Sequence, residues 1–175
     1  MDRRLVIVSG APGTGKTTLA VPLAKALGFP LFSKDLIKET LTEDLGDGCG
    51  DLAASRRIGG AAMNLLWALA AHAPFAVLEA NFRPRSAYER EKLLGLEARI
   101  VEVHCDCGPA EAARRFARRA AATDHHPAHP LKALSPEILA EYDGSVGVGT
   151  VIQVDTHEPV DITRLAAQVE AAWPA

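Results

Sequence analysis

The chain has 175 residues, a length that suits one compact domain, and we expect residues 1–175 to form a single domain. It carries 19 Lys and Arg against 22 Asp and Glu, and the formal net charge of −3 excludes a global basic field that recruits nucleic acid. A hydrophobic content of 48% excludes a disordered chain. Three cysteines, an odd number, argue against a disulfide framework and for the reducing cytoplasm.

Short apolar runs and helical patterns alternate along the chain. The predicted strands span residues 5–8, 31–32, 75–78, 99–103 and 151–154, and the predicted helices span residues 17–27, 35–45, 53–71, 86–95, 109–122 and 160–172. Strands that are apolar throughout require cover on both faces, as parallel sheets have. The sequence therefore predicts an α/β domain with a doubly wound parallel sheet of about five strands.

One apolar stretch, residues 58–78, must be weighed against a membrane span, because Asn64 and His72 are its only strongly polar side chains. Pro74 interrupts the stretch, and many of its residues are alanine, which is too weakly apolar to drive insertion. We therefore interpret it as a buried helix followed by a buried strand, and we expect no contact with a membrane.

The most specific motif lies between the first predicted strand and the first predicted helix. Residues 10–17 read Gly-Ala-Pro-Gly-Thr-Gly-Lys-Thr and match the phosphate-loop pattern G-x-x-x-x-G-K-[ST] in full. The glycines let successive backbone N–H groups point at an anion, and the following helix adds positive potential there. Lys16 is expected to reach the β- and γ-phosphates of ATP, and the Thr17 hydroxyl to bind Mg²⁺. The expected ATP-binding residues of this loop are Gly10, Ala11, Pro12, Gly13, Thr14, Gly15, Lys16, Thr17 and Thr18.

The features after the loop distinguish among the classes of nucleotide-binding protein. The Asn/Thr-Lys-x-Asp motif of guanine-specific switches is missing, and the chain leaves little room for the sensor region of an oligomeric motor. Asp35 instead follows the short strand at Phe32, where strand ends face the nucleotide crevice. It is a candidate to accept a proton from an acceptor hydroxyl. It is also a candidate N-cap of the helix that starts at Leu36, and the two roles are compatible.

The phosphate loop, residues 32–38 and the later arginine pairs together resemble small P-loop kinases of the AAA-type ATPase and kinase group. The most similar families are polynucleotide 5′-kinase domains, chloramphenicol phosphotransferase and zeta toxins. In these families an Asp at the end of the second strand is the general base, and a basic residue three positions later helps to hold the substrate. Asp35 and Lys38 match these two positions. The resemblance covers most of the chain in element order and implies a P-loop NTPase fold of the nucleoside-kinase type.

The acceptor and metal candidates follow the next predicted strand. Glu79 resembles the acid that ends a Walker B strand and holds Mg²⁺ directly or through water. Many relatives carry Asp here, so contact of Glu79 with the substrate stays an alternative. Asn81 and Arg83 are candidate acceptor ligands, although Arg83 is equally compatible with a solvated loop. Arg57, with Arg56 beside it, either reaches the acceptor or coats a helix, and the glycine-rich loop 46–51 is expected to line the acceptor entrance.

Four arginines follow on one predicted helix. The spacing i, i+4 places Arg115 with Arg119 on one face and Arg114 with Arg118 on the next. Adenylate kinases show a similar R-x-x-x-R at the start of their lid, which implies that Arg115 packs on the adenine and Arg119 reaches the transferred phosphate. The pair Arg114 and Arg118 is the competing register, and a solvated basic face is the alternative to both.

Residues 123–135 contain three His and two Pro and are predicted to form an irregular surface loop. Together with the arginine pair, this loop predicts a short lid over residues 115–140 that excludes water during phosphoryl transfer. Pro127 breaks the helical spacing that zinc-binding histidines use, so His125, His126 and His129 are expected to contact phosphate or solvent rather than a metal.

The sequence thus predicts an ATP- and Mg²⁺-dependent kinase that moves the γ-phosphate of ATP to a hydroxyl of a small molecule, a metabolite or an antibiotic. Lys16, Asp35 and Arg119 are the predicted catalytic residues. A polynucleotide 5′-hydroxyl kinase is one alternative, although the negative charge and the few aromatic side chains disfavour it. A regulatory module that binds and slowly hydrolyses ATP without an acceptor is the other.

Overall fold

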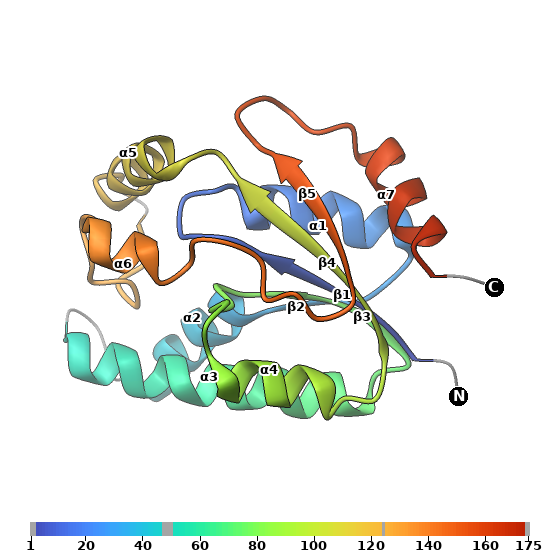
Figure 1. Cartoon of the computed structure of the whole chain (residues 1–175). Coiled ribbons are helices and arrows are strands. Elements are labelled where there is room, and N and C mark those ends of the chain that lie inside the picture. Colours follow the sequence, from blue (N-terminus) through green and yellow to red (C-terminus); the bar gives the residue numbers. More distant parts are fainter. Residues whose placement is uncertain (1–2, 47–50, 124, 174–175) are drawn as a thin grey trace.

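The computed structural model describes residues 3–46, 51–123 and 125–173, which form one parallel sheet covered by helices (Figure 1). The strand order is β2-β3-β1-β4-β5, and every pair of neighbours is parallel. The strands are β1 (Arg4–Ser9), β2 (Leu31–Ser33), β3 (Phe75–Glu79), β4 (Arg99–Asp106) and β5 (Thr150–Asp155). The helices are α1 (Lys16–Leu27), α2 (Lys34–Leu45), α3 (Leu52–His72), α4 (Ala87–Leu94), α5 (Pro109–Ala120), α6 (Pro136–Ala140) and α7 (Ile162–Ala171).

The central strand β1 shows why both faces of the sheet are apolar. Leu5 and Ile7 pack on one face, which α3 and α4 cover, while Val6 and Val8 pack on the other, which α1 and α7 cover. Successive side chains of a strand point to opposite faces, so a fully covered strand must be apolar at every position. The prediction of a doubly wound α/β domain with five parallel strands is confirmed.

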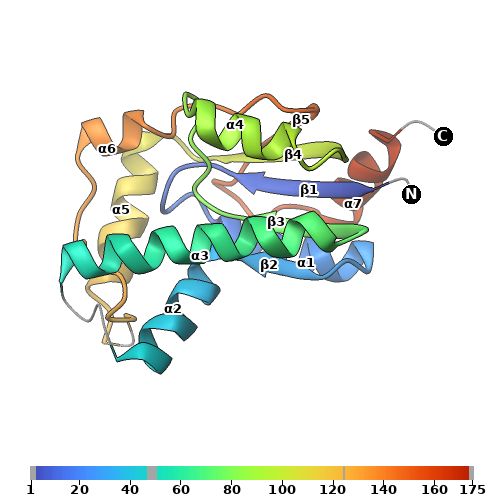
Figure 2. The same cartoon turned by 90° about the horizontal axis from the view of Figure 1, so that it is seen from below.

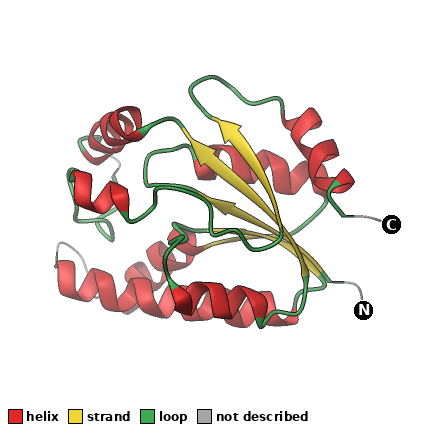
Figure 3. Cartoon of the chain, viewed as in Figure 1, coloured by secondary structure: helices red, strands yellow, loops and turns green. Residues whose placement is uncertain are grey.

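The predicted elements are all present, most of them with ends shifted by one or two residues, and two differences are larger. β4 runs three residues beyond its predicted end, to Asp106. The short helix α6 was not predicted: it follows the segment 123–135 that we expected to be irregular and lies inside the predicted lid, residues 115–140 (Figure 3). Among the described residues, no helix has both the length and the apolarity that a bilayer span requires, and α3 instead lies along the sheet.

Both the phosphate loop and the segments that face it lie at the carboxyl ends of the strands. Figure 2 shows α3 running the length of the molecule beside α2, with α5 and α6 beyond the strand ends. In parallel α/β sheets ligands bind at this edge, where neighbouring connections leave the sheet in opposite directions. The topology therefore brings the ends of β1, β2 and β3 to one place.

One charged side chain is fully buried in β4. Glu102 accepts hydrogen bonds from the Ser9 hydroxyl at 2.6 Å and from the backbone N–H groups of Val146 and Gly147, each at 2.8 Å. These bonds hold the loop before β5 against the sheet. The sequence pattern predicts an apolar strand here and does not identify Glu102 as a buried charge.

We expect Glu102→Ala to lower the free energy of unfolding by roughly 1–3 kcal/mol or more, because the buried Val146 N–H loses its acceptor at about 1–3 kcal/mol and the part-buried Gly147 N–H loses its acceptor as well. Urea unfolding monitored by circular dichroism measures this loss. Glu170→Ala, an exposed change on α7, is the control and should alter the free energy little. Equal stabilities of the two variants would show that the Glu102 hydrogen bonds do not support the fold.

Candidate active site

The phosphate loop joins β1 to α1 and has three glycines with positive φ. Gly10, Gly13 and Gly15 have φ values of 131°, 90° and 83°. A Cβ on Gly10 would lie 2.3 Å from the carbonyl oxygen of Cys105, and one on Gly13 would lie 2.2 Å from that of Ala112. The loop is therefore packed between the end of β4 and the start of α5 so closely that only glycine fits at these two positions.

Lys16 and Thr17 begin α1 beside the ends of β2 and β3. The buried Lys16 ammonium donates to the Ala11 carbonyl at 2.8 Å, and burial lowers its pKa, although Glu79 and Asp35 oppose the shift. Thr17 Oγ1 donates to Glu79 Oε1 at 3.1 Å, and Ser33 Oγ donates to Glu79 Oε2 at 2.5 Å. One carboxylate thus connects the phosphate loop with two neighbouring strand ends.

This set of oxygens suits Mg²⁺. Mg²⁺ in nucleotide sites keeps several waters and phosphate oxygens and takes only one or two protein ligands. The Thr17 hydroxyl and the Glu79 carboxylate are in contact and supply such a pair. No group of three or more His, Cys, Asp or Glu that could hold a metal occurs among the described residues.

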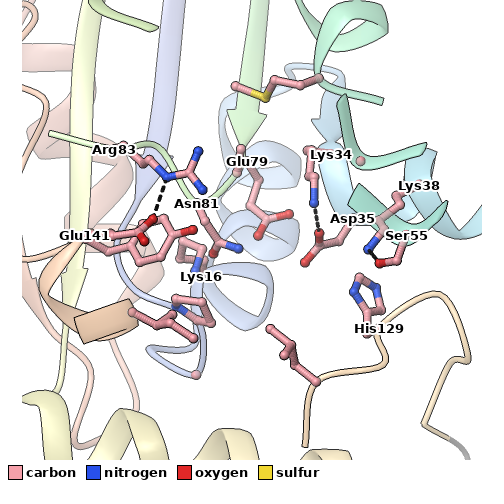
Figure 4. A pocket seen from close by; sticks show the side chains of 18 of the residues that line it. Lys16, Lys34, Asp35, Lys38, Ser55, Glu79, Asn81, Arg83, His129 and Glu141 are labelled. Carbon is pink, nitrogen blue, oxygen red and sulfur yellow. Dashed lines mark hydrogen bonds and ion pairs between the residues drawn. The ribbon is translucent and has the colours of Figure 1, made fainter. Parts of the chain in front are cut away.

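Asp35 occupies the first turn of α2 and faces the phosphate loop (Figure 4). It is not the N-cap of this helix, because the Ser33 hydroxyl accepts from the Leu36 N–H and fills that role. Asp35 Oδ1 accepts from Lys34 Nζ at 2.9 Å. Burial acts to raise the pKa of Asp35, but Lys34, His129 and Lys16 outweigh it and hold the pKa at about 2. Asp35 is therefore a carboxylate at neutral pH.

A cavity of about 720 Å³ opens in front of these residues. Four of the five predicted acceptor residues, Asp35, Lys38, Asn81 and Arg83, line it. Arg57 does not, and its neighbour Arg56 lines the cavity instead. The loop at residues 47–50, which we expected to line the entrance, lies outside the described residues.

Arg83 is held by the segment that follows α6. Its Nε donates to Glu141 Oε2 at 3.0 Å, and its guanidinium lies 5.6 Å from the centre of the Tyr142 ring. Glu141 and Tyr142 both line the cavity, and we did not predict them from the sequence. A signal for this helix existed, because Ser135 followed by Pro136 is a typical helix start, and the Ser135 hydroxyl does cap it.

The arginines of α5 separate into two groups. Arg115 donates to the carbonyls of Thr156 at 2.9 Å and His157 at 3.2 Å and lines a second cavity of about 370 Å³ beside Gly15. Arg119 lines the large cavity. Arg114 pairs with Glu111 at 2.7 Å and, like Arg118, lines neither of these two cavities. The structure therefore places the pair Arg115 and Arg119 at cavities and the competing pair outside them.

The histidines of the predicted lid contact α2. His129 Nε2 lies 2.9 Å from Glu39 Oε1, and His126 Nε2 lies 3.3 Å from Glu43 Oε1. Because both side chains are only partly buried, the expectation that they contact phosphate or solvent stays a prediction. They attach the loop to the wall of the large cavity, which His129 also lines.

Two adjacent glycines of α3 leave part of the cavity open. Gly59 and Gly60 both line it, and a Cβ built on Gly60 meets no atom within 4 Å. Glycine inside a helix is unfavourable by roughly 0.5–1 kcal/mol relative to alanine, so the open space has a cost in stability.

We expect Gly60→Leu to fill part of this space and to lower kcat/KM for an acceptor by about tenfold or more, with the affinity for ATP retained. The matched control is Ala61→Leu, which is exposed on the same helix and does not line the cavity. Steady-state kinetics with the acceptor varied, together with a titration of ATP, measures both effects. Equal kcat/KM values for the two variants would mean that acceptors do not enter beside Gly60.

The family of this chain is shown by comparison with known proteins. A family model described as an AAA domain matches residues 5–136, more than half of the chain. The chain belongs to the AAA domain family. This match confirms the resemblance to the AAA-type ATPase and kinase group, which the phosphate loop indicated. No curated protein matches this AAA domain chain significantly.

Solved structures agree with the family. A candidate kinase from Chloroflexus aurantiacus j-10-fl is 28% identical with a TM-score of 0.86, and the match covers 99% of this chain and 100% of that one. Kti12 from Chaetomium thermophilum, solved with ADP-AlF3, is 16% identical with a TM-score of 0.63 over 98% and 100% of the two chains. Shikimate kinase from Acinetobacter baumannii, solved with shikimate, is 16% identical with a TM-score of 0.56 over 96% and 91%. The AAA domain described here therefore has the fold of small P-loop kinases.

Proposed function

We propose that this AAA domain is an ATP-dependent kinase that transfers the γ-phosphate of ATP to a hydroxyl of a small molecule, a metabolite or an antibiotic. One observation carries the proposal: Asp35, Lys16 and Glu79 line the same cavity of about 720 Å³. This volume lies within the range of small-molecule sites. The shikimate kinase of similar fold is solved with a small hydroxylated acceptor, which agrees with this class of substrate.

The nucleotide is assigned to the phosphate loop and the second cavity. Residues 10–18 hold the phosphates, and Arg115 packs on the adenine where it faces the segment 156–160. Thr17 and Glu79 would hold Mg²⁺, which supplies positive charge to the β- and γ-phosphate oxygens when it is bound.

The transfer step assigns one role to each catalytic side chain. Asp35 accepts a hydrogen bond from the acceptor hydroxyl and points its oxygen at the γ-phosphorus. A new O–P bond forms as the bond between the γ-phosphorus and the β,γ-bridging oxygen breaks, and ADP leaves while the hydroxyl proton passes through Asp35 to solvent. Lys16 and Arg119 offset the charge on the transferring group. A carboxylate with a pKa of about 2 is a weak base, so Asp35 acts mainly by orienting the hydroxyl.

A transfer assay with ATP labelled at the γ-phosphate tests the proposal against its alternatives. The acceptors are a panel of hydroxylated metabolites and antibiotics, an oligonucleotide with a 5′-hydroxyl, and no acceptor. Label on a small molecule supports the proposal. Label on the oligonucleotide alone identifies a polynucleotide kinase, and release of inorganic phosphate alone identifies a hydrolysing regulatory module.

A further inference from the structure

Two of the lysines and arginines that line the large cavity have a carboxylate partner among the described residues. Lys34 pairs with Asp35 at 2.9 Å, and Arg83 pairs with Glu141 at 3.0 Å. Their charges are largely neutralised within the protein. Two further cations line the acceptor side of the cavity, Lys38 on α2 and Arg56 on α3, and they differ in having no ion pair among the described residues.

Lys38 is one of these cations. Its side chain is only 6% exposed, and its Nζ donates to the Ser55 hydroxyl at 2.8 Å, which in turn donates to the Ala128 carbonyl at 2.9 Å. Both partners are neutral. The carboxylates that act on it electrostatically, Asp35 and Glu39, make their hydrogen bonds with Lys34 and His129 instead. Lys38 is therefore a buried cavity-wall ammonium with no carboxylate of its own among the described residues.

Arg56 is the other. It lies on α3 next to Ser55, lines the same cavity, and has no ion-pair partner in the part of the chain that the structure describes. Gly59 of α3 leaves space for the side chains of Lys38 and Lys34. A Cβ at this position would lie 3.7 Å from Lys38 Cε and 3.9 Å from Lys34 Nζ. Two cations that have no ion pair of their own among the described residues, Lys38 and Arg56, thus line the cavity.

A buried ammonium without a counter-charge is costly, and an anion from outside removes that cost. Burial and the neighbouring Lys34 lower the pKa of Lys38 to about 8, as expected for an ammonium that lacks its partner. Lys38 and Asp35 are three residues apart on α2, so their Cβ atoms are about 5–6 Å apart. A ligand that reaches both groups must be compact.

We propose that the acceptor is a small hydroxylated anion, whose carboxylate or phosphate group binds Lys38 and Arg56 while its hydroxyl binds Asp35. This inference rests on the proposed kinase activity and adds the class of acceptor. It also explains why a chain with a net negative charge has a positive cavity wall: the wall selects anionic acceptors and discriminates against neutral sugars and alcohols.

The test compares acceptors that share a carbon skeleton and differ in charge. The probes are D-gluconate against D-gluconamide, D-glucose 6-phosphate against D-glucose, and shikimate against its methyl ester, each with ATP and Mg²⁺. We expect kcat/KM to be about tenfold or more higher for the charged member of a pair. Preference for gluconate identifies a carboxylate site, and preference for glucose 6-phosphate identifies a phosphate site.

Two variants connect that preference to the wall. Arg56→Ala and Lys38→Met should each raise KM for the charged acceptor by about tenfold and leave kcat largely unchanged. Lys25→Ala, which removes a charge from the far end of α1, is the control. Lys38→Met should fold at least as well as the wild type, because it removes a buried charge, and a thermal melt verifies this.

A binding measurement gives a readout that does not depend on turnover. An anion next to Lys38 raises the pKa of this ammonium, so binding at pH 8.5 should take up between about half and about three-quarters of a proton, and affinity should fall as pH rises above 8. Calorimetry with gluconate in two buffers of different ionisation enthalpy counts the protons. The charged groups around Lys38 are Lys34, Asp35, Glu39 and His129, and Lys38→Met isolates its own contribution.

The outcomes separate the two proposals. If neutral acceptors are phosphorylated as well as their charged counterparts, or if Lys38→Met and Arg56→Ala leave the preference intact, the kinase assignment stands and the anionic acceptor is wrong. If only the oligonucleotide is phosphorylated, the protein is a polynucleotide kinase, and both the small-molecule acceptor and its anionic class are wrong. If no compound accepts phosphate, the proposed function fails, and the acceptor class fails with it.

Discussion

Asp35→Asn should bind ATP as the wild type does and lose about 10²–10⁴-fold in kcat for phosphoryl transfer, the range typical of a positioned acid–base group. The amide keeps the size of the side chain but replaces a carboxylate oxygen with a donor. It therefore cannot accept the proton of the acceptor hydroxyl in the same way. Measurement of kcat at saturating ATP, together with the dissociation constant of a non-hydrolysable ATP analogue, separates transfer from binding.

Asp44→Asn provides the matched control, because Asp44 is exposed near the other end of the same helix. Its kcat should equal that of the wild type. Unchanged turnover in Asp35→Asn would exclude the role of Asp35 in transfer. A large loss of affinity for the ATP analogue would instead show that Asp35 serves the nucleotide.

The low pKa of Asp35 also predicts the acid side of the pH profile. A folded-state pKa of about 2 lies below the ordinary value of 3.8, so the carboxylate form prevails at every pH above about 4. The stabilisation that this shift brings is present above pH 3.8 and is lost as pH falls towards 2. Between pH 5 and 8, protonation of Asp35 should therefore cause no fall in the kcat of the wild type towards low pH. The pH profiles of kcat for the wild type and for Asp35→Asn should have the same shape in this range.

Lys16→Ala should have the second large effect, weakening the binding of ATP and lowering kcat by about 100-fold or more. Lys16 is buried where the phosphate loop meets the carboxylates of Glu79 and Asp35, and its removal leaves their negative charge opposed to that of the phosphates. Binding of a fluorescent ATP analogue and single-turnover transfer measure the two losses.

Lys25→Ala on the same helix lies away from the loop and should leave both quantities unchanged. If Lys16→Ala retained wild-type affinity and turnover, the assignment of the nucleotide phosphates to residues 10–18 would be wrong. A thermal melt shows whether the variant is folded, which we expect because the substitution removes a buried charge.

The fold was predictable because its signals are local. Residues 5–8 are apolar at every position, as a strand covered on both faces requires. The loop that follows carries a motif in which the backbone conformation or a close backbone contact requires each glycine. The helix α6 was missed because five residues are too few for an apolar periodicity. Its Ser135–Pro136 start was the only available signal.

The composition of the acceptor cavity was less predictable, because it depends on distant contacts. Sequence alone could not choose between Arg56 and Arg57, because the choice depends on which face of α3 lines the cavity, and this face is the one on which Ser55 contacts Lys38. The pairing of His129 with Glu39 joins residues 90 positions apart. Glu102 was overlooked because its partners are backbone N–H groups, which no sequence pattern identifies.

The fate of the labelled γ-phosphate, followed in parallel in the wild type and Asp35→Asn with small hydroxylated acceptors present, tests the central claim most directly. We predict that the wild type places the label on an acceptor hydroxyl, and that Asp35→Asn binds ATP but transfers almost none of it. Label that appears only as inorganic phosphate, at the same rate in both proteins, would contradict the assignment of this cavity as the active site of a small-molecule kinase.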